Sequence, residues 1–133
     1  MDNNKFIEAK KYIEEIQKVI DIDDPEKLEI FGRDQLEVIY EGMLCNINCI
    51  DFFINHNTFD AFQMEEILDG MRRGIEYTVY AKENIDWKKM MVLKNLLING
   101  FSKEDLESAG LLDDECSWFD ANIIARNPEL LAV

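Results

Sequence analysis

Several residue types and patterns are scarce in this chain of 133 residues. It has one histidine and three cysteines, and an odd cysteine count fits free thiols in a reducing compartment better than a disulfide framework. No apolar run approaches the roughly 20 residues of a membrane span, and the N-terminal stretch MDNNKFIEAKKYIEE lacks an apolar signal core. We therefore expect a cytoplasmic protein that does not enter a membrane.

Basic residues are also scarce. The chain has 14 Lys and Arg against 28 Asp and Glu, which gives a formal net charge of −14. This charge repels bare nucleic acid and anionic membranes and attracts a basic protein surface. Solubility is the alternative explanation for the acidity. The negative charge is regional, however, because the segment from Asp34 to Met71 holds eight acidic residues and no Lys or Arg.

The residues that could hold a metal do not form a convincing set. A zinc site would need the only histidine, His56, together with cysteines. Cys45 and Cys49 have helical spacing, but Asn46 interrupts the predicted helix between them and Cys116 is remote. We therefore interpret Cys49 and Cys116 as small apolar core residues and Cys45 as a boundary residue.

Catalytic motifs are missing as well. The stretch DIDDPEKLE begins like a calcium loop, but Pro25 occupies the third ligand position and no loop glycine follows. The chain has no Gly-rich phosphate loop, no nucleophile elbow and no Cys/His pair in a suitable context. We expect no catalytic residues, no metal, no cofactor and no enzyme activity.

The chain contains an internal repeat. A shift of 28 positions places QLEVIYEGMLCNI, from Gln35 to Ile47, over QMEEILDGMRRGI, from Gln63 to Ile75. A further shift of 26 positions aligns a third copy, whose apolar positions are Met90, Leu93 and Leu97. A weaker fourth copy would place Cys116, Phe119 and Ile123 there. The i, i+3, i+7 spacing predicts an apolar stripe along a helix in each copy.

Glycines recur at two places in the repeat. Gly74 and Gly100 follow the apolar stripes, where a left-handed residue commonly ends a helix. Gly42 and Gly70 fall inside the predicted helices, where glycine costs about 1 kcal/mol relative to alanine. Their recurrence predicts that a neighbouring helix approaches closely at these points.

These patterns predict a single all-α domain, built as a short, α-solenoid-like array of stacked helix pairs. The long helices should span Gln35–Cys45, Asp60–Arg73 and Trp87–Asn99, each followed by a shorter helical segment. Residues 34–110 would hold three helix pairs, and residues 111–133 a C-terminal cap or degenerate fourth repeat. Residues 1–33 would form N-terminal capping helices, with an amphipathic helix whose apolar residues are Phe6, Ala9, Ile13, Ile16 and Ile20.

Helix termini and core aromatics can also be predicted. Gly32 should end the short helix that precedes the array, and Asp34, Thr58 or Asp60, and Asp86 should cap the long helices. The aromatic residues fall where packing between helices needs bulk, so we assign them to the core: Phe52, Phe53, Phe59, Phe62, Tyr77, Tyr80, Trp87, Trp118 and Phe119.

The phrase Gln-Met-x-x-Ile-x-x-Gly-Met-x-x-Gly-Ile, followed by VYA, resembles the short helical repeats of uncharacterised proteins from phages and mobile elements of Firmicutes. The likeness covers about Gln35 to Leu106, and the third copy departs from it by lacking the Gln and the internal Gly. The resemblance implies an all-α repeat domain in a mobile-element setting. It carries over no catalytic residue.

The acidic residues of the first two copies predict a binding surface. Glu37 and Glu41 lie one turn apart, opposite the apolar stripe, and Glu65 and Asp69 occupy the equivalent places in the second copy. On stacked helices the four carboxylates would form one patch that an Arg- or Lys-rich partner could cover. The third copy has Met91 and Asn95 instead, so the predicted patch is local.

Two functional hypotheses follow. In the first, the protein is a non-enzymatic acidic module that binds another protein, and in its sharper form a phage or mobile-element inhibitor, similar to anti-CRISPR proteins, that occupies the basic nucleic-acid-binding surface of a host protein. In the second, it is a helical-repeat scaffold that binds its partner through an apolar groove. Neither involves direct binding of nucleic acid or a membrane, and the partner's identity and the oligomeric state stay open.

Overall fold

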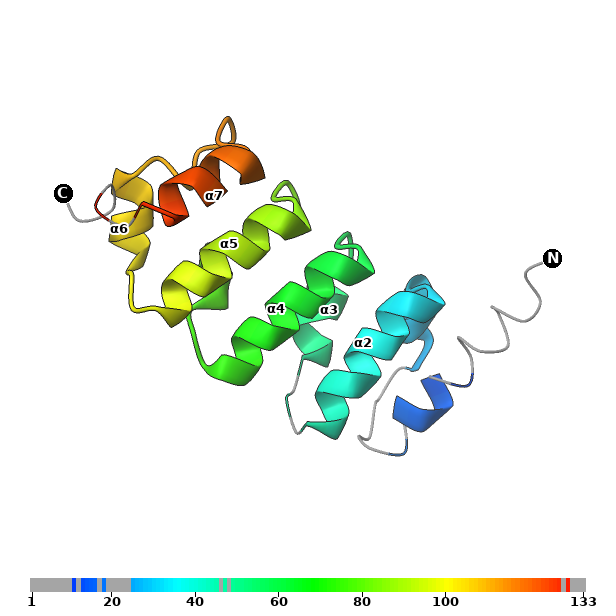
Figure 1. Ribbon diagram of the computed structural model, residues 1–133. Coiled ribbons are helices and arrows are strands. Elements are labelled where there is room, and N and C mark those ends of the chain that lie inside the picture. Colours follow the sequence, from blue (N-terminus) through cyan, green and yellow to red (C-terminus); the bar gives the residue numbers. More distant parts are fainter. Residues whose placement is uncertain are drawn as a thin grey trace. The chain divides into compact units, whose positions relative to one another are not determined.

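The computed structural model of the protein describes residues 11, 13–16, 18, 25–45, 47, 49–127 and 129. Every regular element in these residues is a helix, no strand occurs among them, and helices pack against one another (Figure 1). The protein is therefore all-α, as the sequence predicts. None of the helices in this part of the chain is long and apolar enough to cross a membrane.

The long helices lie close to their predicted positions. In chain order, the elements are the 3-10 helix η1 (Pro25–Ile30), α2 (Arg33–Leu44), α3 (Ile50–Asn55), α4 (Ala61–Arg73), the 3-10 helix η2 (Tyr77–Val79), α5 (Trp87–Ile98), α6 (Lys103–Ser108) and α7 (Trp118–Ala125). A short helical segment follows each of α2, α4 and α5, which confirms the predicted alternation.

The chain forms two compact units, and the boundary between them falls inside α4. The first unit is Met1–Leu68, which contains α2, α3 and most of α4. The second is Asp69–Val133, which contains the last residues of α4 and the elements from η2 to α7. A continuous solenoid through both units stays a prediction.

The apolar stripes of the repeat form the cores of the units. The first two stripe residues are buried in each of the first three copies. The third stripe residue is buried in the first copy, where it is Met43, and half-buried in the other two, where it is Met71 and Leu97. The buried stripe residues are Leu36, Ile39, Met43, Met64, Ile67, Met90 and Leu93. The helical periodicity of the sequence therefore identifies most of the core. At the N-terminal end residues 13–16 are helical and Ile16 is buried, whereas Phe6, Ala9 and Ile20 lie outside the described residues.

The glycines at the helix ends adopt the predicted conformation. Gly74 has a φ of 70° and Gly100 a φ of 96°, so both are left-handed and end α4 and α5. The amide of the next residue bonds back to the helix in each case, because Ile75 N–H donates to the Gly70 carbonyl and Phe101 N–H to the Leu96 carbonyl. These bonds satisfy carbonyls that the helix itself leaves without a partner.

Two of the predicted N-caps are confirmed and one is wrong. Asp60 and Asp86 accept backbone N–H groups at the starts of α4 and α5, from Gln63 at 2.8 Å and from Lys88 at 3.3 Å. Helix α2, however, begins at Arg33 with Gly32 as its N-cap, so Asp34 lies inside the helix. Gly32 has an extended backbone with a φ of −78° and is not the left-handed end of η1.

The predicted fourth copy has the wrong register. Helix α7 has Ser117 as its N-cap, which lies 31 positions after the N-cap of α5, Asp86, instead of the 26 that the predicted alignment requires. The longer connection after α6 shifts the buried face to Ala121 and leaves Phe119 and Ile123 exposed. The predicted core role is also wrong for Trp118 and Phe62, which are exposed, and for Cys116, which is half-buried.

Candidate functional site

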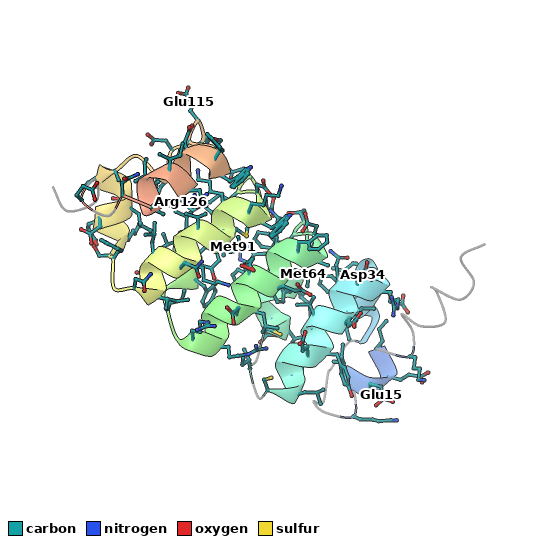
Figure 2. All side chains as sticks on the ribbon, viewed as in Figure 1. Glu15, Asp34, Met64, Met91, Glu115 and Arg126 are labelled. Atoms are coloured by element: carbon teal, nitrogen blue, oxygen red, sulfur yellow. The ribbon has the colours of Figure 1, made fainter. Side chains whose placement is uncertain are left out.

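Helices α2 and α4 position the acidic residues of the first unit. Glu37 and Glu41 lie one turn apart on α2, and Glu65 lies in the N-terminal half of α4; all three side chains are exposed. The equivalent residue of the third copy is Met91, which is exposed on α5 (Figure 2). The third copy therefore has no carboxylate at the position of Glu65.

A glycine allows α2 and α4 to approach each other closely. A Cβ atom at Gly42 would lie 2.8 Å from Leu68 Cδ1 on α4 and 2.7 Å from Cys49 Sγ at the start of α3. At Gly70 a Cβ atom would overlap the hydroxyl of Tyr80 and lie 3.0 Å from Tyr77 Cβ. The internal glycines therefore mark close approaches, as predicted. At Gly42, both the start of the following short helix α3 and the next long helix α4 come close to α2.

In the first and third copies, a side chain near the start of the long helix donates to a backbone carbonyl further along the chain. Gln35 accepts the Gly32 N–H through Oε1 at 2.8 Å, and its Nε2 donates to the Phe59 carbonyl at 2.7 Å. In the third copy Lys89 Nζ donates to the Asp113 carbonyl at 3.0 Å, across the same separation of 24 residues. The sequence alone did not predict this contact, although Gln35 and Lys89 occupy the same position, three residues after the N-cap.

The negative charges of neighbouring glutamates act on the carboxylate of Glu65. The pKa of Glu65 is raised above its usual value, first by partial burial and then by the negative charges of Glu41, Glu66 and Glu37. Helices α2 and α4 therefore bring Glu37 and Glu41 near enough to Glu65 for their charges to act on it. We call Glu37, Glu41 and Glu65 the acidic cluster. Its carboxylates can accept charge-assisted hydrogen bonds from Arg or Lys.

Asp69, the fourth predicted member of the patch, has a different environment. It pairs with Lys94 Nζ at 2.8 Å and with Arg73 Nε at 3.1 Å, and Arg72 lies 4.0 Å away. Partial burial opposes its ionisation, but the hydrogen bonds from Lys94 and Arg73 outweigh that effect and lower its pKa. Asp69 is therefore neutralised within its own chain, and we exclude it from the acidic cluster.

The cysteines and the histidine do not gather into a site. Cys49 is fully buried, and burial raises the pKa of its thiol to about 11, which makes it unreactive near neutral pH. Cys45 is exposed, and the exposed His56 stacks on Phe52 with ring centroids 4.6 Å apart. Within the described residues, no three His, Cys, Asp or Glu side chains come together in a way that could hold a metal ion.

Comparisons of the chain with protein families, with curated proteins and with solved structures find no match.

Proposed function

We propose that this protein binds a basic surface of another protein through the acidic cluster and catalyses no reaction. The observation that carries the proposal is geometric: Glu37, Glu41 and Glu65 are exposed on two helices that approach each other closely at Gly42. The charges of Glu41 and Glu37 add to partial burial in raising the pKa of Glu65. The stretch from Asp34 to Met71 contains no Lys or Arg that could neutralise them locally. Arginine or lysine from a partner would relieve the repulsion and form charge-assisted hydrogen bonds.

In the sharper form of the proposal, the protein is a cytoplasmic inhibitor encoded by a phage or mobile element. It occupies the nucleic-acid-binding surface of a host protein, as some anti-CRISPR proteins do. Two features support this form: the net charge of −14, and the resemblance of the repeat to proteins of mobile elements. A negatively charged protein that competes with nucleic acid must present closely spaced anionic groups on a surface held rigid by its fold.

The proposal is tested by replacing Glu37, Glu41 and Glu65 with Gln, which removes three charges and keeps helix propensity. The variant should melt at the same temperature as the parent or slightly higher, because repulsion is removed. Its affinity for the partner captured from host lysate should fall by about 1–3 kcal/mol, mainly through slower association. A matched control replaces the exposed Glu76, Glu104 and Glu115 of the second unit, which removes the same charge elsewhere.

Quantitative mass spectrometry of proteins captured by the parent and both variants, at two salt concentrations, gives the readout. The proposal requires one partner that is lost from the cluster variant, kept by the control variant and weakened by salt. That purified partner should also release bound nucleic acid when the parent protein is added. Equal capture by both variants would contradict the acidic-cluster proposal and favour the alternative scaffold, whose apolar contacts persist or strengthen in salt.

A further inference from the structure

Helix α7 exposes large apolar side chains that the repeat pattern alone would place in a core. Trp118, Phe119 and Ile123 are exposed to 37%, 58% and 44%, and we call these three residues the α7 face. Trp118 and Phe119 form an edge-to-face pair with centroids 6.1 Å apart, and Lys88 Nζ lies 5.3 Å from the centroid of the Trp118 ring. The α7 face therefore lies on a helix that packs against α5 (Figure 1).

The repeat shows what kind of element such a face accepts. Counted from the N-cap, Ile123 of α7 is equivalent to Val38 of α2 and Val92 of α5. Val38 is 2% exposed and Val92 7% exposed, and in both units another long helix packs alongside: α4 against α2 at Gly42, and α7 against α5. The same position in α7 is exposed, so a further helix could pack on this face. We call this surface the seat.

The charge beside the seat indicates which helix would fit. Gln35 and Lys89 each donate a hydrogen bond to a carbonyl of the next segment, and the equivalent residue of α7 is the exposed Asp120. An ionised carboxylate accepts hydrogen bonds but cannot donate one. Asp120 is one turn from Ile123, and the exposed Asp113, Asp114 and Glu115 precede the helix. These four carboxylates outnumber the nearby cations Lys88 and Lys89, so the setting has a net negative charge. It repels both a backbone carbonyl and the α7 of a second copy, whereas it attracts Lys or Arg.

We propose that the α7 face is a docking site for an amphipathic helix of another protein that carries Lys or Arg next to its apolar stripe. The apolar residues of that helix cover Phe119 and Ile123, and a basic residue pairs with Asp120. The site is independent of the acidic cluster, because it lies in the second unit and depends on apolar contact. Replacing Glu37, Glu41 and Glu65 with Gln therefore leaves the docking site intact. A negative result for the docking site can then be distinguished from a negative result for the proposed function.

The test uses a helical Leu/Lys amphipathic peptide as the probe and its Leu/Glu counterpart as the control peptide. The protein has two tryptophans, so two indole N–H signals in a nitrogen–proton correlation spectrum report on Trp118 and on Trp87, and Trp118→Phe assigns them. Titration of the Trp118 signal gives a dissociation constant for each peptide. This constant should be at least about tenfold lower for the Leu/Lys peptide than for the Leu/Glu peptide. Phe119→Ser and Ile123→Ser should each weaken that binding by about tenfold.

Controls separate this site from general attraction of a cation to an acidic protein. Leu44→Ser, at a residue with 57% exposure on α2, should leave the Trp118 titration unchanged. Asp120→Lys should reverse the preference between the two peptides, and circular dichroism should show that each variant keeps the parent's helicity. A Trp118 signal that does not respond, or responds equally in the Ile123→Ser variant, would overturn the proposal. So would self-association in sedimentation velocity that Ile123→Ser abolishes, because the seat would then belong to a second copy.

Discussion

Two carboxylates one turn apart on α4 should respond in opposite directions when their charge is removed. Partial burial and then the charges of neighbouring acids raise the pKa of Glu65. Asp69 is also partly buried, but its hydrogen bonds with Lys94 and Arg73 lower its pKa. Glu65→Gln and Asp69→Asn each remove one negative charge from the same helix and retain a polar amide. We predict that the first variant is slightly more stable than the parent and the second clearly less stable.

The contacts give the size of each effect. The bond from Asp69 to Arg73 joins residues at i, i+4 with an exposed cation, and such pairs contribute about 0.3–0.5 kcal/mol. Lys94 is only 10% exposed, and a charge-assisted hydrogen bond of this kind contributes about 1.5–3 kcal/mol. Because the Asp69 side chain is 22% exposed, we take the lower part of that range and expect a loss of about 2 kcal/mol for Asp69→Asn. Glu65→Gln should gain a few tenths of a kcal/mol, because its carboxylate is solvated.

The dependence on pH also has opposite signs. The stabilisation from ionised Asp69 is complete above its unfolded pKa, near 3.8, and is lost as the pH falls through the lower folded value. The destabilisation from Glu65 is complete above its raised folded pKa, and it disappears as the pH falls toward the unfolded value, near 4.5. As the pH falls, the stability difference between Glu65→Gln and the parent should therefore vanish first. The stability difference between Asp69→Asn and the parent should vanish at a lower pH.

Thermal melting followed by circular dichroism, at neutral pH and at several values down to pH 3, measures both differences. A loss of about 2 kcal/mol corresponds to a fall of roughly 6–10 °C for a domain of this size. A melting temperature for Asp69→Asn equal to or above the parent's would refute the reasoning, because Asp69 would then be one more repelled acid. Glu65→Gln is the matched control, since a general effect of lowering the net charge would raise both melting temperatures.

Three further predictions concern backbone geometry and the contacts between repeats. Gly74→Ala should cost about 1 kcal/mol in thermal melting, because the left-handed backbone and not a steric contact opposes the substitution, and Gly74→Asn should cost less; an unchanged melting temperature would contradict this. Gly42→Ala should cost about 1–3 kcal/mol by overpacking, and a double-mutant cycle with Leu68→Ala should show recovery, whereas strict additivity would exclude the close approach. Lys89→Met should lower the free energy of unfolding in urea by about 0.5–1.5 kcal/mol, because the bond to the Asp113 carbonyl is lost, and equal urea midpoints would show that the bond contributes nothing.

Much of the fold could be predicted because its signals are local. The spacing of Met64, Ile67 and Met71 selects one face of a helix whatever the rest of the chain does, and α4 forms where that stripe predicts it. Gly74 and Gly100 end helices because only glycine reaches a left-handed backbone without strain, a property that the sequence carries by itself. The repeat likewise indicated the close approaches at the internal glycines and the exposed side chains of Glu37, Glu41 and Glu65.

Tertiary structure decided the features that depend on distant partners. Nothing near Asp69 in the chain shows that Lys94 of α5 would reach it, so the sequence could not separate a paired carboxylate from the repelled Glu65. The register of α7 depends on the length of the connection after α6, which moved Phe119 and Ile123 from a predicted core to the surface. Whether an apolar stripe is covered depends on which helix packs against it, and helical periodicity carries no information about that choice.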